Sequence, residues 1–260
     1  MIASLGMYDR AETAAANDRL WDGLRDGLRA RGIDAPEDLT RGAAAYWPAW
    51  EAPDLVFSQT CGFPYRARLH GQVTLVGSPD YGLPGCAPGH YNSVFVVRAS
   101  DPRQDLTDYA QARFAYNDGF SQSGWAAPQN HATGLGFQFE PTLQSGGHRM
   151  SALAVAEGRA DIAAMDALTF ALCQRYDPFM ADLREVARTD PTPALPFIAG
   201  PGADADACFA ALSQAVADLG ADDSRTLGLR DVVQIPAAAY LAVPTPPSPE
   251  TMIAQFGQRS

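Results

Sequence analysis

The stretch Arg113-Phe114-Ala115-Tyr116, followed closely by Ser121-Gln122-Ser123-Gly124, predicts a strand that leads into a helix opened by serine hydroxyls. A second unit of the same kind follows, with Phe137–Pro141 as the strand and Gln144-Ser145-Gly146-Gly147-His148 at the helix start. The first amides of a helix lack partners inside it, and the positive end of the helix dipole lies there, so such a start binds anions. Two such starts in succession predict a cleft that holds one small anionic ligand.

The same alternation of strand-like and helix-like patterns extends over nearly the whole chain. Apolar and β-branched runs predict further strands at Ile2–Met7, Leu55–Ser58, Val73–Gly77, Asn92–Val97, Asp161–Ala164, Leu183–Thr189 and Val232–Ile235. Amphipathic or alanine-rich runs predict helices at Ala11–Arg31, Phe63–Leu69, Ser123–His131, Gly147–Glu157, Ala167–Tyr176, Ala205–Leu219 and Glu250–Phe256. This alternation indicates an α/β protein with mainly parallel sheets.

Two extended segments, Ser93–Val97 and Leu195–Ala199, bracket the middle of the chain. This arrangement is typical of a two-lobe protein, in which the chain leaves one lobe, builds a second and returns. We expect residues 1–94 and 200–260 to form lobe one, and residues 95–199, with the hinge crossings, to form lobe two. Ligands in such architectures bind between the lobes, at the carboxyl ends of the strands.

The composition excludes several classes of function. The 260-residue chain has a net charge of −11 and no basic run, which argues against binding to nucleic acid or to an anionic membrane surface. It contains no lysine, so the lysine-dependent P-loop, kinase and pyridoxal chemistries are excluded. An anion must therefore be bound locally, by dipoles and hydroxyls rather than by a positive field.

Targeting signals indicate the cellular location of the protein, and cysteine spacing indicates whether it binds a metal or forms disulfides. No apolar run approaches the roughly 20 residues that span a bilayer, and Met1 leads directly into a core strand without a signal peptide. We expect a periplasmic protein if a leader has been removed, and otherwise a cytoplasmic one. The four cysteines lack the C-x-x-C spacing of zinc or redox sites, and no metal or cofactor is expected. Cys61 and Cys86 form either a disulfide or two thiols, whereas Cys173 and Cys208 are expected as buried thiols.

A series of segments resembles one known family. Asp54–Thr60, Tyr91–Ser93, Ser121–Gly124, Ser145–His148 and Gly158–Ala164 occur in the order found in phosphonate/phosphate-type (PhnD-like) substrate-binding proteins of ABC transporters. The resemblance implies a type II periplasmic binding protein-like fold, with two α/β lobes joined by two extended crossover segments and the ligand cleft between them.

The resemblance also implies roles for the serine-rich helix start. Ser121 and Ser123, with the Gly124 amide, take the role of gripping the anion, and His148 assists them. Gln122 stands where the family has a third hydroxyl, which favours a ligand with amide-like groups beside its acid. The alternative is that Ser121 and Ser145 are only helix caps, each of which stabilises its helix by about 1 kcal/mol, and that His148 is a surface histidine without a ligand.

Further ligand contacts are expected from both lobes. The resemblance places Asp166 where an acidic residue holds a ligand amine, and a buried carboxylate beside an anion does require a cation. Tyr8 and Tyr91 match aromatic positions that line the cleft, and Gln59 and Thr60 lie in a loop that faces it. Helix capping by Asp166 and core packing by the two tyrosines are the alternatives.

The sequence therefore predicts a solute-binding protein. It captures a small anionic or zwitterionic, phosphonate- or phosphate-like ligand by hinge closure and delivers it to the permease of an ABC transporter. No nucleophilic elbow, zinc motif or dinucleotide fingerprint is present, so we expect no enzymatic activity. A two-lobe cytoplasmic enzyme and a ligand-sensing module that use the same cleft remain the alternatives.

Overall fold

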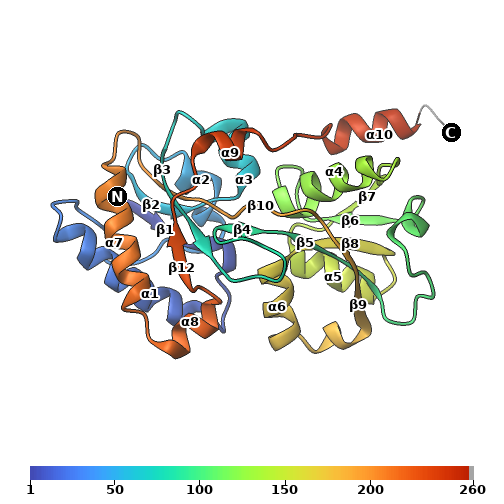
Figure 1. Ribbon diagram of the computed structural model, residues 1–260, viewed down its shortest axis with the longest axis horizontal. Helices are drawn as coiled ribbons and strands as arrows, with labels where there is room; N and C mark the ends of the chain where they lie inside the picture. Colours follow the sequence, from blue (N-terminus) through green and yellow to red (C-terminus); the bar gives the residue numbers. More distant parts are fainter. Residues whose placement is uncertain (258–260) are drawn as a thin grey trace. The chain divides into compact units, whose positions relative to one another are not determined.

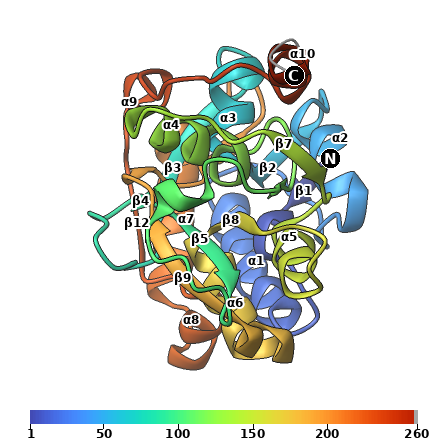
Figure 2. The ribbon, with the colours of Figure 1, turned by 90° about the vertical axis from the view of Figure 1, so that its right-hand side faces the viewer.

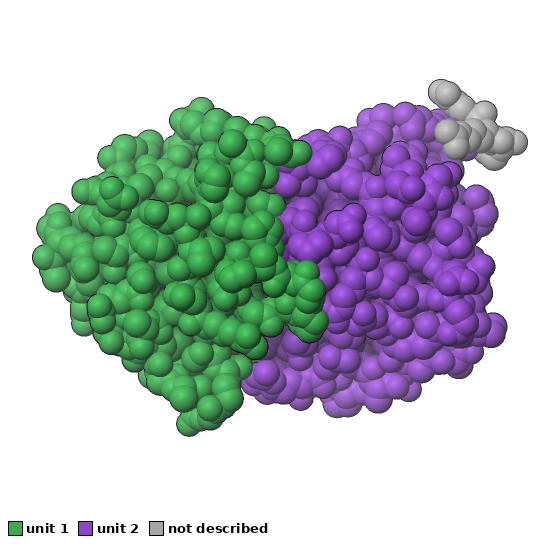
Figure 3. Space-filling model, viewed as in Figure 1, with its two compact units in different colours: residues 1–90, 193–242 green, residues 91–192, 243–260 purple. Residues whose placement is uncertain are grey.

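The computed structural model describes residues 1–257 and divides the chain into two compact units. Unit 1 contains Met1–His90 and Pro193–Ala242, and unit 2 contains Tyr91–Thr192 together with the chain from Val243 onward (Figure 3). The connecting strands β4 (His90–Tyr91) and β10 (Thr192–Pro193) pair as a two-stranded sheet.

The bounds of the units differ from the expected lobes in three places. The strand at Ser93–Arg98 belongs to unit 2 from its start, because it pairs with two strands of the unit 2 sheet. The strand at Phe197–Ala199 belongs to unit 1, where it lies between two strands of the unit 1 sheet. The chain from Val243 onward belongs to unit 2 and not to lobe one, since Trp125 Nε1 donates to the carbonyl of Pro247 at 3.1 Å.

Unit 1 is built on a mixed five-stranded sheet in the order β1-β2-β11-β3-β12. Strands β1 and β2 are parallel, whereas β11 runs antiparallel to both of its neighbours. The strands are β1 (Ile2–Ser4), β2 (Leu55–Gln59), β11 (Phe197–Ala199), β3 (Thr74–Asp80) and β12 (Asp231–Val233). The short helices of the unit are η1 (Gly6–Tyr8), η2 (Gly42–Ala45), α2 (Trp47–Trp50), α3 (Gly62–Pro64), η3 (Tyr65–Leu69), α8 (Ala221–Leu227) and α9 (Ala237–Leu241).

Two longer helices, α1 (Ala14–Arg29) and α7 (Ala205–Ala217), pack against each other in unit 1 (Figure 1). The apolar face predicted for α1 is buried, since Leu24 and Leu28 are fully inaccessible. Gly27 allows the close approach, because a Cβ atom there would lie 3.2 Å from the Cβ of Ala211. The pairing of a glycine with an alanine therefore sets the separation of the two helices.

Unit 2 is built on a second five-stranded sheet in the order β7-β6-β8-β5-β9. Strand β6 is parallel to β7 and β8, and β5 is antiparallel to β8 and β9. The strands are β7 (Pro141–Gln144), β6 (Phe114–Tyr116), β8 (Ile162–Asp166), β5 (Ser93–Arg98) and β9 (Leu183–Arg188). The helices are η4 (Leu106–Tyr109), η5 (Gln122–Ala126), α4 (Ala127–Gly134), α5 (His148–Ala156), α6 (Ala167–Tyr176), η6 (Pro178–Asp182) and α10 (Pro249–Gly257).

The helices of unit 2 cover both faces of its sheet. Figures 1 and 2 show α4 on one face and α5 with α6 on the other. This follows from the strand order, because the chain moves one way from β6 to β7 and the other way from β7 to β8. The two helix starts that the sequence singled out follow the carboxyl ends of β6 and β7, and β8 leads directly into α6.

The strand predicted at Phe137–Pro141 is wrong, since β7 covers Pro141–Gln144 instead. The backbone around Phe139 is held by a side chain and not by a neighbouring strand. Gln129 Nε2 donates to the carbonyl of Phe139 at 2.8 Å, and the Phe139 amide donates to Gln129 Oε1 at 3.1 Å. The Phe139 ring stacks on Phe114 with ring centroids 4.7 Å apart, so this segment is anchored as part of the core.

The structure resolves the alternatives for Cys61 and Cys86 in favour of two thiols. Cys61 is buried just before α3, whereas the Cys86 Sγ points to the Pro84 carbonyl of its own loop at 3.8 Å. Cys173 and Cys208 are buried thiols, as the sequence predicts. Within residues 1–257, no helix has the length and apolar character that crossing a bilayer requires.

Candidate functional site

The helix start after β6 is built as the sequence predicts, but its hydrogen bonds differ in one respect. Ser121, Gln122 and Ser123 are 6%, 2% and 3% exposed, so the polar stretch is buried. Ser121 Oγ accepts the Gly124 amide proton at 3.0 Å, which makes Ser121 the N-cap of η5. The Gly124 amide is thus used inside the helix start, and its contact with a ligand stays a prediction.

Ser123 is joined to His148 and through it to the neighbouring strand. Ser123 Oγ lies 2.9 Å from His148 Nε2, and His148 Nδ1 lies 3.3 Å from the carbonyl oxygen of Ala164 on β8. The expected partnership of the serine and the histidine is thus present in unit 2. The hydrogen bonds connect η5, α5 and β8 at one place.

Gly124 also has a packing role that the sequence did not predict. A Cβ atom at this position would lie 1.8 Å from Asn117 Oδ1 and 3.1 Å from His148 Cε1. A side chain of any kind would therefore displace Asn117 and press on the imidazole. Asn117 Oδ1 is buried and has no hydrogen-bond partner among the described residues. Asn117 was not predicted, although its place just after a strand and before the serine-rich turn was a usable signal.

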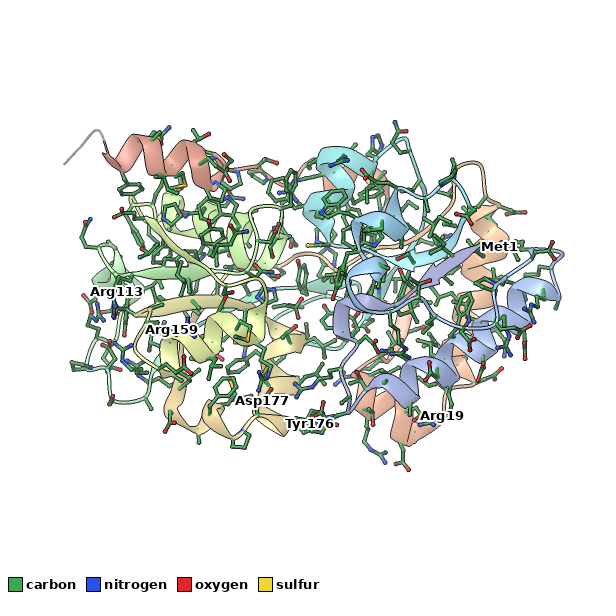
Figure 4. All side chains as sticks on the ribbon, turned by 180° about the vertical axis from the view of Figure 1, so that it is seen from behind. Met1, Arg19, Arg113, Arg159, Tyr176 and Asp177 are labelled. Atoms are coloured by element: carbon green, nitrogen blue, oxygen red, sulfur yellow. The ribbon has the colours of Figure 1, made fainter. Side chains whose placement is uncertain are left out.

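Burial controls the charge of His148. Removal of the imidazole from water lowers the pKa of His148 to about 4, and the hydrogen bond to the Ala164 carbonyl only partly opposes this change. The next residue, Arg149, donates to Asp177 at 2.7 Å, and Figure 4 shows Asp177 at the end of α6. His148 is therefore neutral near pH 7 and lies on a helix start that an ion pair fastens to α6.

Asp166 ends β8 and opens α6. Its Oδ1 accepts the Thr169 amide proton at 2.9 Å, so the capping alternative is observed, and the residue is 2% exposed. Asp166 lies two residues after Ala164, whose carbonyl binds His148. Contact with a ligand amine, which capping through one oxygen does not preclude, stays a prediction.

In unit 1, Gln59 connects the predicted residues to one that the sequence reasoning missed. Gln59 Nε2 donates to Tyr81 Oη at 2.9 Å and to the Leu195 carbonyl at 3.2 Å. The rings of Tyr8 and Tyr81 meet edge to face, with centroids 5.4 Å apart. Tyr81 comes directly after β3, and Tyr8 ends the short helix η1 that follows β1, so an aromatic residue soon after a sheet strand was the available signal.

Thr60 and Tyr91 are both buried. Thr60 is fully inaccessible, its amide donates to the Pro196 carbonyl at 3.0 Å, and its Oγ1 has no partner among the described residues. Tyr91 is 1% exposed at the start of unit 2. Burial of this degree is what core packing requires, so a contact of Tyr91 with ligand stays a prediction.

A pocket or a group of metal-ligating residues would be a further candidate site in the described part of the chain. A pocket of about 460 Å³ in unit 2 is lined by Gln111, Thr133, Gly136, Phe137, Gln138 and Phe256, none of which is a predicted site residue. Among residues 1–257, no group of His, Cys, Asp and Glu side chains could hold a metal ion. The polar cluster at Ser121–Gly124 and His148 is the candidate site of unit 2, because it brings predicted site residues together.

Two α/β units, each on a five-stranded sheet, and a buried hydroxyl-lined helix start define a solute-binding protein of the type II class. Residues 54–238 match the family described as "ABC transporter, phosphonate, periplasmic substrate-binding protein". The match covers well over half of the chain, so the protein belongs to this family, as the sequence resemblance implied. A search of curated proteins gave no match.

Solved structures share the fold along nearly the whole chain. PhnD1 from Prochlorococcus marinus, in complex with methylphosphonate, is 14% identical with a TM-score of 0.71, and the match covers 99% of this chain and 98% of that one. A binding protein component of an ABC phosphonate transporter from Pseudomonas aeruginosa is 17% identical with a TM-score of 0.67, over 99% and 86% of the two chains. A histidine kinase sensor domain is 14% identical with a TM-score of 0.60, over 89% and 97%. At these identities the likeness establishes the fold.

Proposed function

We propose that this protein binds a small organic phosphonate or phosphate ester through the cluster at Ser121–Gly124 and His148. The observation that carries the proposal is the buried hydroxyl of Ser123, which is fixed by His148 beside a helix start in a member of the phosphonate-binding family. The dipole of η5 and α4 adds a positive potential at that start. These features let a chain of net charge −11 bind an anion locally.

The rest of the proposed function follows from membership of the family. The protein delivers its ligand to the permease of an ABC transporter in the periplasm and does not transform it. The fold is shared with a histidine kinase sensor domain, so a sensing role would use the same residues. Turnover of a bound ligand would instead support the enzyme alternative, and incubation with the ligand followed by phosphorus NMR detects it.

Calorimetric titration tests the binding proposal with methylphosphonate, 2-aminoethylphosphonate and phosphate esters. We expect at least one of them to bind, and we expect the double variant Ser121→Ala/Ser123→Ala to lose at least 100-fold in affinity. Ser100→Ala is the matched control, because Ser100 is exposed in a turn of the same unit. Absence of binding to every phosphorus oxyanion, or equal binding by the double variant, would contradict the proposal.

Hinge closure on the ligand stays a prediction from the sequence. Small-angle X-ray scattering with and without a ligand that binds tightly tests it. We expect a smaller radius of gyration in the bound state, and an unchanged radius would exclude closure as the means of capture.

A further inference from the structure

The direction of the hydrogen bonds around Ser123 is fixed by the chemistry of the groups that take part. The Ala164 carbonyl oxygen only accepts, so His148 Nδ1, at 3.3 Å, carries a proton. A neutral imidazole has one N–H, so His148 Nε2 is then an acceptor. The contact of 2.9 Å between Nε2 and Ser123 Oγ is therefore made by the serine proton, which the hydroxyl donates to the histidine.

This direction decides what Ser123 can offer to a ligand. A hydroxyl has one proton and two lone pairs, and the proton of Ser123 is committed to His148. Toward any other neighbour, Ser123 Oγ is consequently a hydrogen-bond acceptor. An oxyanion oxygen is also an acceptor, so a fully ionised acid group finds no donor at this hydroxyl.

A second acceptor lies in the same place. Asn117 Oδ1 is buried and has no partner among residues 1–257. It lies close to the Cα of Gly124, and the His148 ring lies on the same side, since a single Cβ position on Gly124 would meet both. A buried oxygen without a donor is destabilising, so a ligand that brings a proton here gains binding free energy that a ligand without one does not.

We propose that this subsite selects the acid group that keeps one proton, so that a P–OH group of the ligand donates to Ser123 Oγ or Asn117 Oδ1. The inference rests on the proposed function and adds the protonation state of the bound ligand. Phosphonate and phosphate monoanions have such a proton near neutral pH. Sulfonates have the same tetrahedral shape but no proton, so the subsite discriminates against them.

Protonation of His148 is the competing explanation, because it would turn Ser123 into a donor. Burial opposes it by lowering the imidazole pKa to about 4, and the hydrogen bond to the Ala164 carbonyl, which raises the pKa, only partly offsets the effect of burial. The charged groups on α5 and on the elements packed against it are Arg149, Asp166, Arg98, Arg175, Asp182, Arg184, Glu185 and Arg188. Arg149 pairs with Asp177, and Arg98 with Asp161, so these two cations already have carboxylate partners.

Titration calorimetry with methylphosphonate and methanesulfonate at pH 6 and pH 9 tests the inference. At pH 6 we expect methylphosphonate to bind at least 100-fold more tightly than methanesulfonate. At pH 9 methylphosphonate is a dianion, so we expect weaker binding and uptake of one proton, detected as a binding enthalpy that depends on the buffer. Methanesulfonate should bind weakly at both pH values.

The variant Ser123→Ala distinguishes two roles of Ser123, acceptance of a ligand proton and mere support of the fold. We expect the ratio of phosphonate to sulfonate affinity to fall by at least 10-fold, whereas Ser100→Ala leaves the ratio unchanged. Because Ser123→Ala can lower stability, circular dichroism and the melting temperature are measured on the same samples, and the pH series on the unmodified protein is a test that needs no variant. Equal affinities for the two ligands, or tight sulfonate binding with proton uptake, would overturn the inference and leave the proposed function intact. Binding of neither ligand nor any other phosphorus oxyanion would instead remove the proposed function itself.

Discussion

The two units differ in the residues that follow some of their strands and precede the next helix. In unit 2, Ser121 and Asp166 each cap the helix that follows by accepting an amide proton from three residues further on. In unit 1, Thr13 and Cys61 precede α1 and α3 without a side-chain cap. Unit 1 instead presents a buried amide with two aromatic rings. Under the proposed function, we therefore expect unit 2 to bind the acid group through its hydroxyls, and unit 1 to contribute Gln59 and its aromatic neighbours.

The largest expected effect comes from Gly124→Ala in unit 2. The added methyl would meet Asn117 Oδ1 at 1.8 Å and His148 Cε1 at 3.1 Å, so one of them must move. We expect phosphonate affinity to fall more than 100-fold and stability to fall by about 1–3 kcal/mol. Gly134→Ala is the matched control, because nothing lies within 4 Å of that position at the end of α4. Calorimetry and urea unfolding measure both, and wild-type affinity in Gly124→Ala would remove Gly124 from the site.

The second largest expected effect is a pH dependence of stability that arises from His148 in unit 2. The pKa of His148 is about 4 in the folded protein, whereas an unperturbed histidine has a pKa of 6.5. Between pH 4 and pH 6.5 the unfolded chain therefore binds more protons than the folded one. The stability that neutral, buried His148 contributes is therefore complete above pH 6.5 and is lost as the pH falls to 4. The loss in the free energy of unfolding is at most about 3 kcal/mol. Urea unfolding from pH 7.5 to 4 measures it. His148→Gln should flatten this part of the profile, and the same change at the exposed His70 should not.

A smaller effect is expected from Gln59→Leu in unit 1. The substitution leaves the buried carbonyl of Leu195 and the hydroxyl of Tyr81 without this donor, which lowers stability by about 1–3 kcal/mol. We expect the ratio of phosphonate to sulfonate affinity to stay as in the parent protein. Tyr81→Phe is the control, since it keeps the ring against Tyr8 and removes the hydroxyl. A changed ratio of phosphonate to sulfonate affinity in Gln59→Leu would show that unit 1 also takes part in selecting the acid group.

The smallest effect is expected from Asp166→Asn. Asparagine caps a helix about as well as aspartate, so stability should change little. If the ligand carries an ammonium group that Asp166 contacts, affinity for 2-aminoethylphosphonate should fall about 10-fold, the scale of one charged hydrogen bond, while affinity for methylphosphonate stays. Equal losses for the two ligands would contradict the amine contact.

Local sequence patterns predicted those parts of the fold that local interactions determine. The helix Ala167–Tyr176 has the predicted bounds, because Asp166 caps its start and an apolar run follows. The strand at Phe137–Pro141 was misplaced because the hydrogen bonds of Phe139 come from Gln129, on the preceding helix. The unit assigned to the chain from Val243 onward was wrong for the same reason, since contacts with Trp125 and Asn130 decide it.

The candidate site shows the same limit. The order of Ser121, Ser123 and His148 in the sequence was enough to predict a cluster. It could not predict that the Gly124 amide bonds to Ser121, because Ser121 could equally have bound a ligand. Asn117 and Tyr81 were missed, since their contacts with Gly124 and Gln59 exist only in the folded units.

The return of the chain to unit 2 after Ala242 has a practical consequence. The first helix, α1, and the last, α10, lie in different units, although each is close to an end of the described chain. Fluorophores attached to exposed positions of α1 and α10 therefore label one unit each. The protein is in this way a natural scaffold for a resonance energy-transfer sensor, whose signal would report in real time on any ligand-driven motion of the units.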